Sequence, residues 1–599
     1  MLKSTRSSLK RILIAWAVAP FVLLILVNGF LNVGLPIVFR TLDPAKVQVR
    51  YTYAWMIWPG WVHVRNLHIQ QFSALDTWEL IAEQASGNIR VMEIASDRRF
   101  HATSLRGNGL TFRYSTEGDP NLSRAKDPLT VILDDLVVTD LREIALGPVH
   151  LSGAGVVSGD LVLDRRLATS HVTVEAEDLA IRLGSDPMFA HVVGTIRLDV
   201  ENLEKHPDYG SARFHDLNAT AVLTADSQDL RFLDRYLGQT PWLSLTGSGI
   251  VDLDVALVHG SLTPGSRLSV DSPELVVRFL SNEVTGEAQV RFAVTGTEPN
   301  VESALTVDFL NYTIHTDAGP TPLVQGAGFR LAAHTENLGL DRPPSPVALT
   351  FDLPPSHISD FRSYNGFLPT DIGFEAMGGR GEIHGHLEAS TEDQLARGDL
   401  FITGTELGAT FGQVSVKSNL ALNAHLEEGD LSTGRYDLSG STGSLTQVNF
   451  VSQQAGSRLG RDRNWWTRAS LAAGTATVGA EEYLNVRVEL ECQSTDPLVA
   501  IFTDGGTLPR WASGILSVND VRGSAKIVLA NQRMVVEPCE IQAGPYNLRL
   551  HLVREPAGNQ GRLLVKYGLL SLGVDLPKGG GKATFRVFPK ASWFETPSK

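Results

Sequence analysis

The sequence predicts a mainly β protein: a single N-terminal transmembrane helix, then a long, mostly antiparallel, repeated β-sheet curled into an apolar groove, with a few short helices. Three observations lead to this prediction. Residues 12–39 contain no ionisable side chain. Segments in which apolar and polar residues alternate recur along the rest of the chain, as in half-buried strands. The 55 Gly and 29 Pro suit many strands and turns better than long helices.

The apolar run at residues 12–39 predicts a membrane anchor, because a helix needs roughly 20 apolar residues to cross a bilayer. Lys3, Arg6, Lys10 and Arg11 precede it without an acidic residue, so the positive-inside bias places residues 1–11 in the cytoplasm as a basic leader. A cleaved signal peptide is the alternative. The run is too long for one, and no small-residue cleavage site follows it. We therefore expect an uncleaved, single-pass anchor, with the bulk of the chain beyond the membrane.

Aromatic side chains crowd into the segment that follows the anchor: Tyr51, Tyr53, Trp55, Trp58 and Trp61. Aromatic residues with one apolar and one hydrated end collect at membrane interfaces, so these five are candidate interface residues. Packing in the core of the first strands is the alternative, and the sequence favours neither.

Strand-like alternation begins at Trp61 and slips by one residue before Leu67. A strand about every 12 residues gives some 45 strands, and one continuous sheet of them would extend on the order of 200 Å. The apolar face of the sheet must be hidden by a second sheet, by helices or by an apolar ligand. A sandwich core and a ligand-lined groove both remain open. The candidate lipid-groove residues on this face are Val174, Val290, Phe292, Val294, Leu305, Val307, Phe309, Leu420, Leu422, Leu426, Val486, Val488 and Leu490.

A longer repeat is predicted from four segments that open with a capping residue, reach a Gly and meet a Pro soon after. These segments are residues 140–147, 226–238, 358–366 and 496–505. An N-cap, a C-terminal Gly and a following Pro delimit a helix. We expect four divergent units, each a set of strands opened by a short helix.

Composition and motifs argue against several functions. The formal net charge is −14, and nucleic-acid binders need clustered Lys and Arg for contacts with phosphate. The charge therefore argues against nucleic-acid binding. His384 and His386 share a strand face but lack a third ligand, and Gly579–Lys582 lacks the Ser or Thr of a phosphate loop. Cys492 and Cys539 follow the inward parity of their strands, and free thiols are favoured over a bridge. We expect no enzyme activity, catalytic residue, metal or cofactor.

The chain resembles the AsmA-like family, with TamB-like proteins as more distant relatives. The resemblance is carried by the anchor, by residues 58–69 (WPGWVHVRNLHI), by Leu508-Pro509, by Asp520–Gly523 and by Gly573–Leu576. It divides the chain into an AsmA-like N-terminal β region at 45–127, repeated groove units at 128–479 and an AsmA-like C-terminal region at 480–599.

The resemblance also implies a place and a role. It implies a protein of the Gram-negative inner membrane whose periplasmic groove holds the acyl chains of phospholipid or another lipid, as a lipid-transport conduit or an outer-membrane maintenance factor. The alternative is a scaffold or assembly factor for outer-membrane or secreted proteins, without lipid transport.

Overall fold

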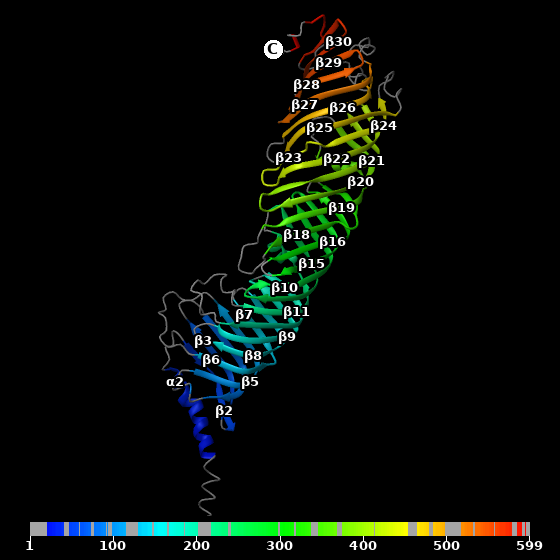
Figure 1. Cartoon of the computed structure of the whole chain (residues 1–599). Coiled ribbons are helices and arrows are strands. Elements are labelled where there is room, and N and C mark those ends of the chain that lie inside the picture. Colours follow the sequence, from blue (N-terminus) through cyan, green and yellow to red (C-terminus); the bar gives the residue numbers. More distant parts are fainter. Residues whose placement is uncertain are drawn as a thin grey trace, which may run out of the picture.

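In a computed structural model of the chain, nearly all of the described residues belong to one continuous sheet of 32 strands. The strands lie side by side in chain order, from the N-terminal helix to the C-terminal end (Figure 1). The structure describes residues 21–40, 47–58, 60–72, 77–90, 93, 99–115, 130–146, 149–163, 167–184, 186–201, 217–237, 241–297, 300–316, 319–336, 346–367, 374–411, 414–452, 464–478, 483–496, 517–530, 533–555, 558–577, 584–589 and 593–594.

The strands are long, and many of them span 10 to 17 residues. The first group is β1 (Val47–Arg50), β2 (Tyr53–Trp58), β3 (Trp61–Phe72), β4 (Thr77–Ile89), β5 (Arg99–Ser115), β6 (Thr130–Val138), β7 (Leu141–Leu146), β8 (Val149–Leu163), β9 (Leu167–Leu183), β10 (Asp186–Glu201) and β11 (Leu217–Ser227). The middle group is β12 (Leu243–Val258), β13 (Ser261–Leu262), β14 (Arg267–Phe279), β15 (Asn282–Thr297), β16 (Asn300–Thr316), β17 (Gly319–Gly326), β18 (Arg330–Glu336), β19 (Ala348–Ile358), β20 (Phe374–Ser390), β21 (Leu395–Phe411) and β22 (Val414–Asp430). The last group is β23 (Arg435–Asp437), β24 (Thr442–Ser452), β25 (Trp465–Thr477), β26 (Tyr483–Ser494), β27 (Asn519–Ala530), β28 (Arg533–Ala543), β29 (Tyr546–Glu555), β30 (Gly558–Tyr567), β31 (Leu570–Leu576) and β32 (Thr584–Val587).

Strand pairing confirms the mainly β, mostly antiparallel prediction. The described pairs are antiparallel except where β5 lies parallel to β6 and β7. Five pairs of short strands share a rung (β1/β2, β6/β7, β13/β14, β17/β18 and β23/β24), so the 32 strands form 27 rungs. At about 4.8 Å a rung the ladder extends roughly 125 Å. The predicted 45 short strands and 200 Å were wrong, because segments expected as separate strands merge into long ones.

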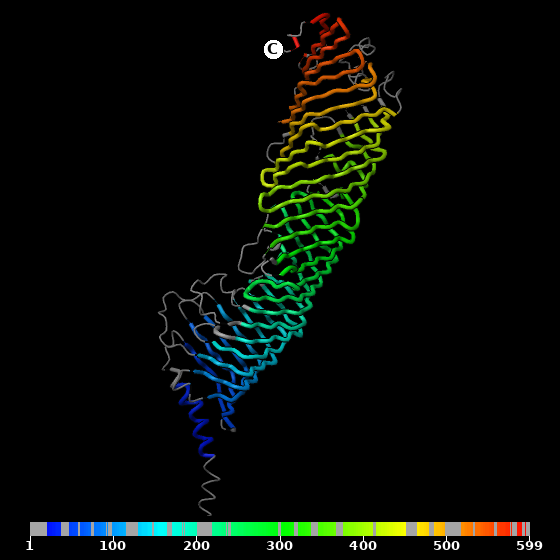
Figure 2. The backbone as a smooth tube through the Cα atoms, in the orientation of Figure 1, coloured from blue at the N-terminus to red at the C-terminus, as the bar shows by residue number. Residues whose placement is uncertain are grey.

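Local irregularities explain both why expected strand segments merge into long strands and why the sheet curves. The one-residue slip before Leu67 lies at Asn66, whose φ of 52° is in the left-handed region, and the buried positions change there from Val62 and Val64 to Leu67 and Ile69 while β3 keeps its register with β4. Ser104, Asp135, Glu406 and Gln447 have the same conformation at register shifts of their own strands. A bulge bends its strand and increases the local twist, so bulges on successive strands curve the whole sheet (Figure 2).

Helical segments are few in the described part of the chain. Residues 21–40 form one helical stretch that includes η1 (Phe30–Gly34) and α2 (Leu35–Arg40). No helix among the described residues is long and apolar enough to cross a membrane. Residues 12–20 of the predicted anchor lie outside the described residues.

Two of the four predicted short helices are present, as the 3₁₀ helices η4 (Leu230–Leu237) and η5 (Phe361–Phe367). Each is capped by an aspartate: Oδ1 of Asp229 accepts from the Arg231 amide, and Oδ1 of Asp360 accepts from the Arg362 amide. The prediction for residues 140–147 was wrong, since they contain strand β7, whose backbone pairs with β5 on one side and β8 on the other. The fourth segment begins at Asp496, and its remainder lies outside the described residues.

The core lies on one face of the sheet, here called the inward face. One cluster of buried side chains runs without a break from Leu31 to Leu431, and η4 adds Leu230, Leu233 and Leu237, each at most 1% exposed. Two small clusters follow towards the C-terminus, around Trp465 and around Val565. The inward face is therefore filled by the protein's own side chains over its N-terminal two thirds.

Candidate functional site

The predicted groove residues of strands β9, β15 and β16 are buried. Val290 and Val307 are 0% exposed, and Phe292, the most exposed of the set, is 7% exposed. Val174, Val294, Leu305 and Phe309 are buried with them. These side chains fill the trough between β9 and β16, so they form a protein core at this level.

The predicted groove residues further along the chain are more exposed. Leu420, Leu422 and Leu426 of β22 and Val488 and Leu490 of β26 are all half-buried, and only Val486 is fully buried. Neighbouring inward residues that the sequence did not single out share this state, namely Ile402, Leu445, Leu471, Ile527 and Ile541. From β21 to β28 the inward face thus keeps part of its apolar surface accessible. Whether lipid contacts it stays a prediction.

Small residues open space along this stretch. Directly opposed residues on successive rungs run Leu422, Gly443, Ala469, Leu490, Gly523 and Ile541. A Cβ built on Gly443 would meet only Leu422 Cδ1, at 3.6 Å. The position therefore has room for a side chain, and a larger residue there would fill the trough.

The N-terminal helix is tied to the edge of the sheet by two asparagines. Oδ1 of Asn28 accepts from the Met56 amide at 2.8 Å while its Nδ2 donates to the Met56 carbonyl at 2.9 Å. Asn32 makes the same pair of bonds with Ala54, at 3.1 and 2.6 Å. The two side-chain amides lie one helical turn apart, and they hydrogen-bond the edge of β2 as the backbone of a neighbouring strand would. The sequence analysis missed them, although two asparagines at i and i+4 in an apolar helix were a signal.

The predicted interface aromatics divide into two groups. Tyr51 is half-buried, donates to the Leu31 carbonyl, and lines a small apolar cavity with Leu31 and Leu35; burial raises its pKa to about 12. Tyr53 stacks on Trp55, which stacks on His63, with ring centroids 5.6 and 4.9 Å apart. Trp61 is 36% exposed. The side chain of Trp58 lies outside the described residues, and membrane contact of the group stays a prediction.

Charges alternate across the strands on the outward face. His68, Glu79, Arg113, Glu143 and His150 form a chain of ion pairs over β3, β4, β5, β7 and β8, with N–O distances of 2.6–3.3 Å. A second ladder runs Asp308, Arg330, Asp352, His386, Asp399 and His425 over successive rungs. Opposite charges directly across a pair stabilise its register.

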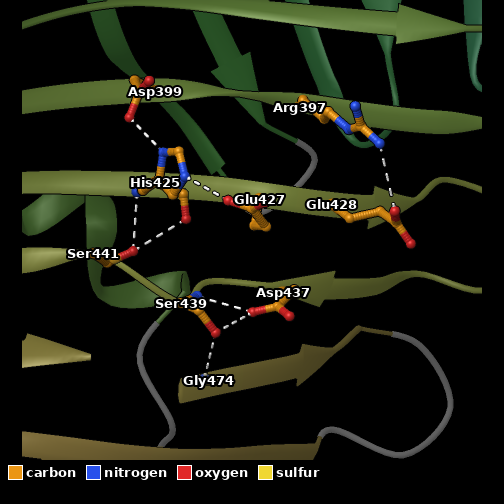
Figure 3. A network of polar contacts seen from close by, with 9 residues as sticks. All are labelled: Arg397, Asp399, His425, Glu427, Glu428, Asp437, Ser439, Ser441 and Gly474. Atoms are coloured by element: carbon orange, nitrogen blue, oxygen red, sulfur yellow. Dashed lines mark hydrogen bonds and ion pairs between the residues drawn. The ribbon is translucent and has the colours of Figure 1, made fainter. Parts of the chain in front are cut away.

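The second ladder ends at an irregular rung. His425 contacts Asp399 at 2.8 Å and Glu427 at 3.1 Å, and its backbone amide donates to Ser441 Oγ (Figure 3). Ser439 Oγ accepts from the Gly474 amide, and its own amide donates to Asp437. These polar side chains satisfy backbone groups where β23 gives way to β24, which is a structural role.

The two cysteines are free and buried, as predicted. They lie on β26 and β28 with β27 between them, since Cys492 is opposite Val521 and Cys539 is opposite Ala525. Burial raises the pKa of each thiol to about 11. Such thiols are poor nucleophiles at neutral pH.

No group of three or more potential metal ligands occurs among the described residues. His384 stacks on Phe401, whereas His386 pairs with Asp352, so the two imidazoles predicted on one face have different partners. Comparisons with models of protein families, with curated proteins and with solved structures gave no match.

Proposed function

We propose that this protein holds acyl chains of a lipid on the inward face of its sheet between β21 and β28, as a lipid-transport conduit or maintenance factor of the Gram-negative envelope. The observation that carries the proposal is the half-buried apolar surface at Leu422, Val488 and Leu490, beside the space at Gly443 and Ala469. Acyl chains need apolar surface and no directional contacts, so this surface suits them.

The proposal includes a place in the cell. Residues 12–39 anchor the chain in the inner membrane, with residues 1–11 in the cytoplasm and the sheet in the periplasm. The Asn28 and Asn32 contacts fix the second half of this segment directly to the first rung of the sheet, so the proposal places β2 close to the membrane. A reporter that is active only outside the cytoplasm should function when fused after Lys599, and a reporter that stays silent there would contradict the topology.

Site-specific photocrosslinking tests the lipid proposal. A photoreactive phenylalanine analogue at Leu422 or Leu490 should capture lipid in cells. The same residue at Arg487 or Lys526, which are exposed on the outward face, is the matched control and should capture none. Equal capture from both faces, or none from the inward face, would contradict the proposal.

A scaffold for outer-membrane or secreted proteins is the second candidate. It is favoured by the last strand, β32, whose described partner is β31 alone. Val587 and the adjacent Phe588 are 72% and 60% exposed. An open strand edge with exposed apolar residues can pair with a strand of another protein. Crosslinks from Val587 to a protein, without lipid capture at Leu422, would favour the scaffold.

A further inference from the structure

A hollow of about 560 Å³, here called the outer-face hollow, is lined by residues of strands β20 to β26. Most of its lining residues share the outward parity of Phe401 and Asn423, but Ile402, Leu422, Gly443 and Ala469 of the proposed lipid surface line it as well. This outer-face hollow has a floor of short side chains: Thr403, Ala421, Asn423, Thr442, Ser444 and Ser470. Its volume lies in the range of small-molecule sites, which is about 300–1,000 Å³. The short floor residues of β21 and β22 lie beside the ion-paired ladder at His386, Asp399 and His425, which runs over β20, β21 and β22.

Two different walls bound the hollow. On one side Phe401 and His384 stack with ring centroids 5.0 Å apart, and 37% of Phe401 is exposed. On the other side stand Arg468, Glu489 and Glu491. The Arg468 guanidinium lies 5.5 Å from the centre of the Trp466 ring, and it has no ion-pair partner in the described part of the chain.

The floor also holds an unsatisfied acceptor. Oδ1 of Asn423 is buried and has no hydrogen-bond donor among the described residues. Leaving such an atom unpaired is costly, so a ligand N–H or O–H at this place would be stabilising.

The chemistry of the hollow excludes several ligand classes. One arginine faced by two glutamates disfavours phosphate. The lining mixes apolar residues with hydroxyl and charged groups, so it suits a ligand with both apolar and polar surfaces better than a bare acyl chain. A peptide strand is disfavoured as well, because the strands that form the floor have their backbone groups paired on both sides. The hollow suits a ring that has apolar C–H faces and polar edges. The flat aromatic wall fits the C–H face, and the hydroxyls, the amide and the unpaired charge fit the polar edges.

We infer that the outer-face hollow binds a pyranose sugar unit of a glycan. The C–H face of the ring stacks on Phe401, one of its O–H or acetamido N–H groups donates to Asn423 Oδ1, and further hydroxyls bond to Thr442, Ser444 and Ser470. The inference does not depend on the proposed lipid function, because it rests on the side chains of outward parity and its test measures sugar binding alone.

Titration of the full-length chain with chitotriose and with cellotriose tests this inference, in a detergent without a sugar headgroup. At least one of the two should bind saturably, with a Kd of about 1 mM or below. Binding of chitotriose alone assigns the Asn423 contact to an acetamido N–H, and binding of both assigns it to a hydroxyl. Phe401→Ala should weaken binding at least tenfold, about 1.4 kcal/mol. Ser470→Phe should abolish binding by filling the hollow.

Arg397→Ala is the matched control, because Arg397 lies on the same strand and face as Phe401 but outside the hollow. It should leave binding unchanged. Unfolding curves establish that each variant is folded. If Phe401→Ala is not folded, Ser470→Phe decides the question alone. The inference is overturned if neither sugar binds at about 10 mM, or if folded Ser470→Phe binds like the wild type.

Discussion

Phe292 and Leu422 both point to the inward face, but they differ in their surroundings. Phe292 is 7% exposed within the continuous core, whereas Leu422 is half-buried beside Gly443. From alternation alone, the two positions were expected to be equivalent. Burial by residues far away in sequence distinguishes them, and a strand pattern carries no information about such contacts.

Substituting aspartate at each of the two positions tests this difference in burial. Phe292→Asp places an uncompensated charge in a closed core, which costs several kcal/mol, so the sheet around β15 should unfold. Leu422→Asp leaves its carboxylate within reach of water and should fold nearly normally. Circular dichroism and thermal unfolding measure both. Equal tolerance at the two positions would mean that the inward face is uniform along its length.

The folding stability should depend on pH through His425 and His386. Hydrogen bonds to Asp399 and Glu427 raise the pKa of His425, and a hydrogen bond to Asp352 raises the pKa of His386. Because the folded-state pKa is above the unfolded value of about 6.5, the stabilisation is complete below that value and is lost as pH rises through the folded pKa.

We therefore expect His425→Gln to be less stable than the wild type at pH 6, with the difference shrinking towards pH 8.5. Denaturant unfolding at several pH values measures it. A difference that grows with pH would show that the ion pairs with Asp399 and Glu427 do not stabilise the fold.

At the scale of elements, the junction between helix and sheet depends on Asn28 and Asn32. Replacing both by Leu leaves the N–H and C=O groups of Ala54 and Met56 without these partners, and each group left buried costs about 1–3 kcal/mol. The double variant should exchange amide hydrogens much faster at β1 and β2. Val33→Leu, at a position that is 64% exposed on the same helix, is the control. Unchanged exchange in the double variant would mean that other contacts hold the helix.

Several elements could be predicted and others could not, for physical reasons. The slip before Leu67 was visible because the alternation of buried residues shifts by one position there. The Asp-Leu-Arg sequence at the start of η4 (Asp229) also stands at Asp140, yet its segment is a strand that pairs with β5 and β8. Leu141 and Ile144 have helical spacing, and a register shift between them in β7 lets both be buried. The outer-face hollow could not be predicted, because it joins residues from six strands.

At the scale of the whole molecule, the ladder of 27 rungs predicts an elongated particle. A rod of roughly 125 Å has a radius of gyration of about 36 Å, whereas a compact chain of this length would have one of about 25 Å. Small-angle neutron scattering of the full-length chain, with the detergent contrast-matched, distinguishes them. A value near 25 Å would contradict the continuous sheet.

The inward face changes along this rod, and the change bears on the proposed function. Near the helix it is closed by Leu31 and Leu35, which are 1% and 6% exposed, and from β21 onward the continuous core cluster retains only Ala396, Leu407 and Leu431 as fully buried residues. The accessible stretch begins at β21, some 16 rungs from β1, or roughly 75 Å away. We expect lipid to be held far from the anchored end.

The most direct test of the account is to measure the lipid that the purified full-length chain retains, by native mass spectrometry, before and after the trough is filled. The Gly443→Leu/Ala469→Leu variant puts two side chains into the space beside Leu422 without a positive φ at Gly443. The matched control, Thr442→Leu/Arg487→Leu, alters the outward face. The account predicts lipid on the wild type and the control, and little on the filled variant. An absence of lipid on the wild type, or equal lipid on all three, would contradict it.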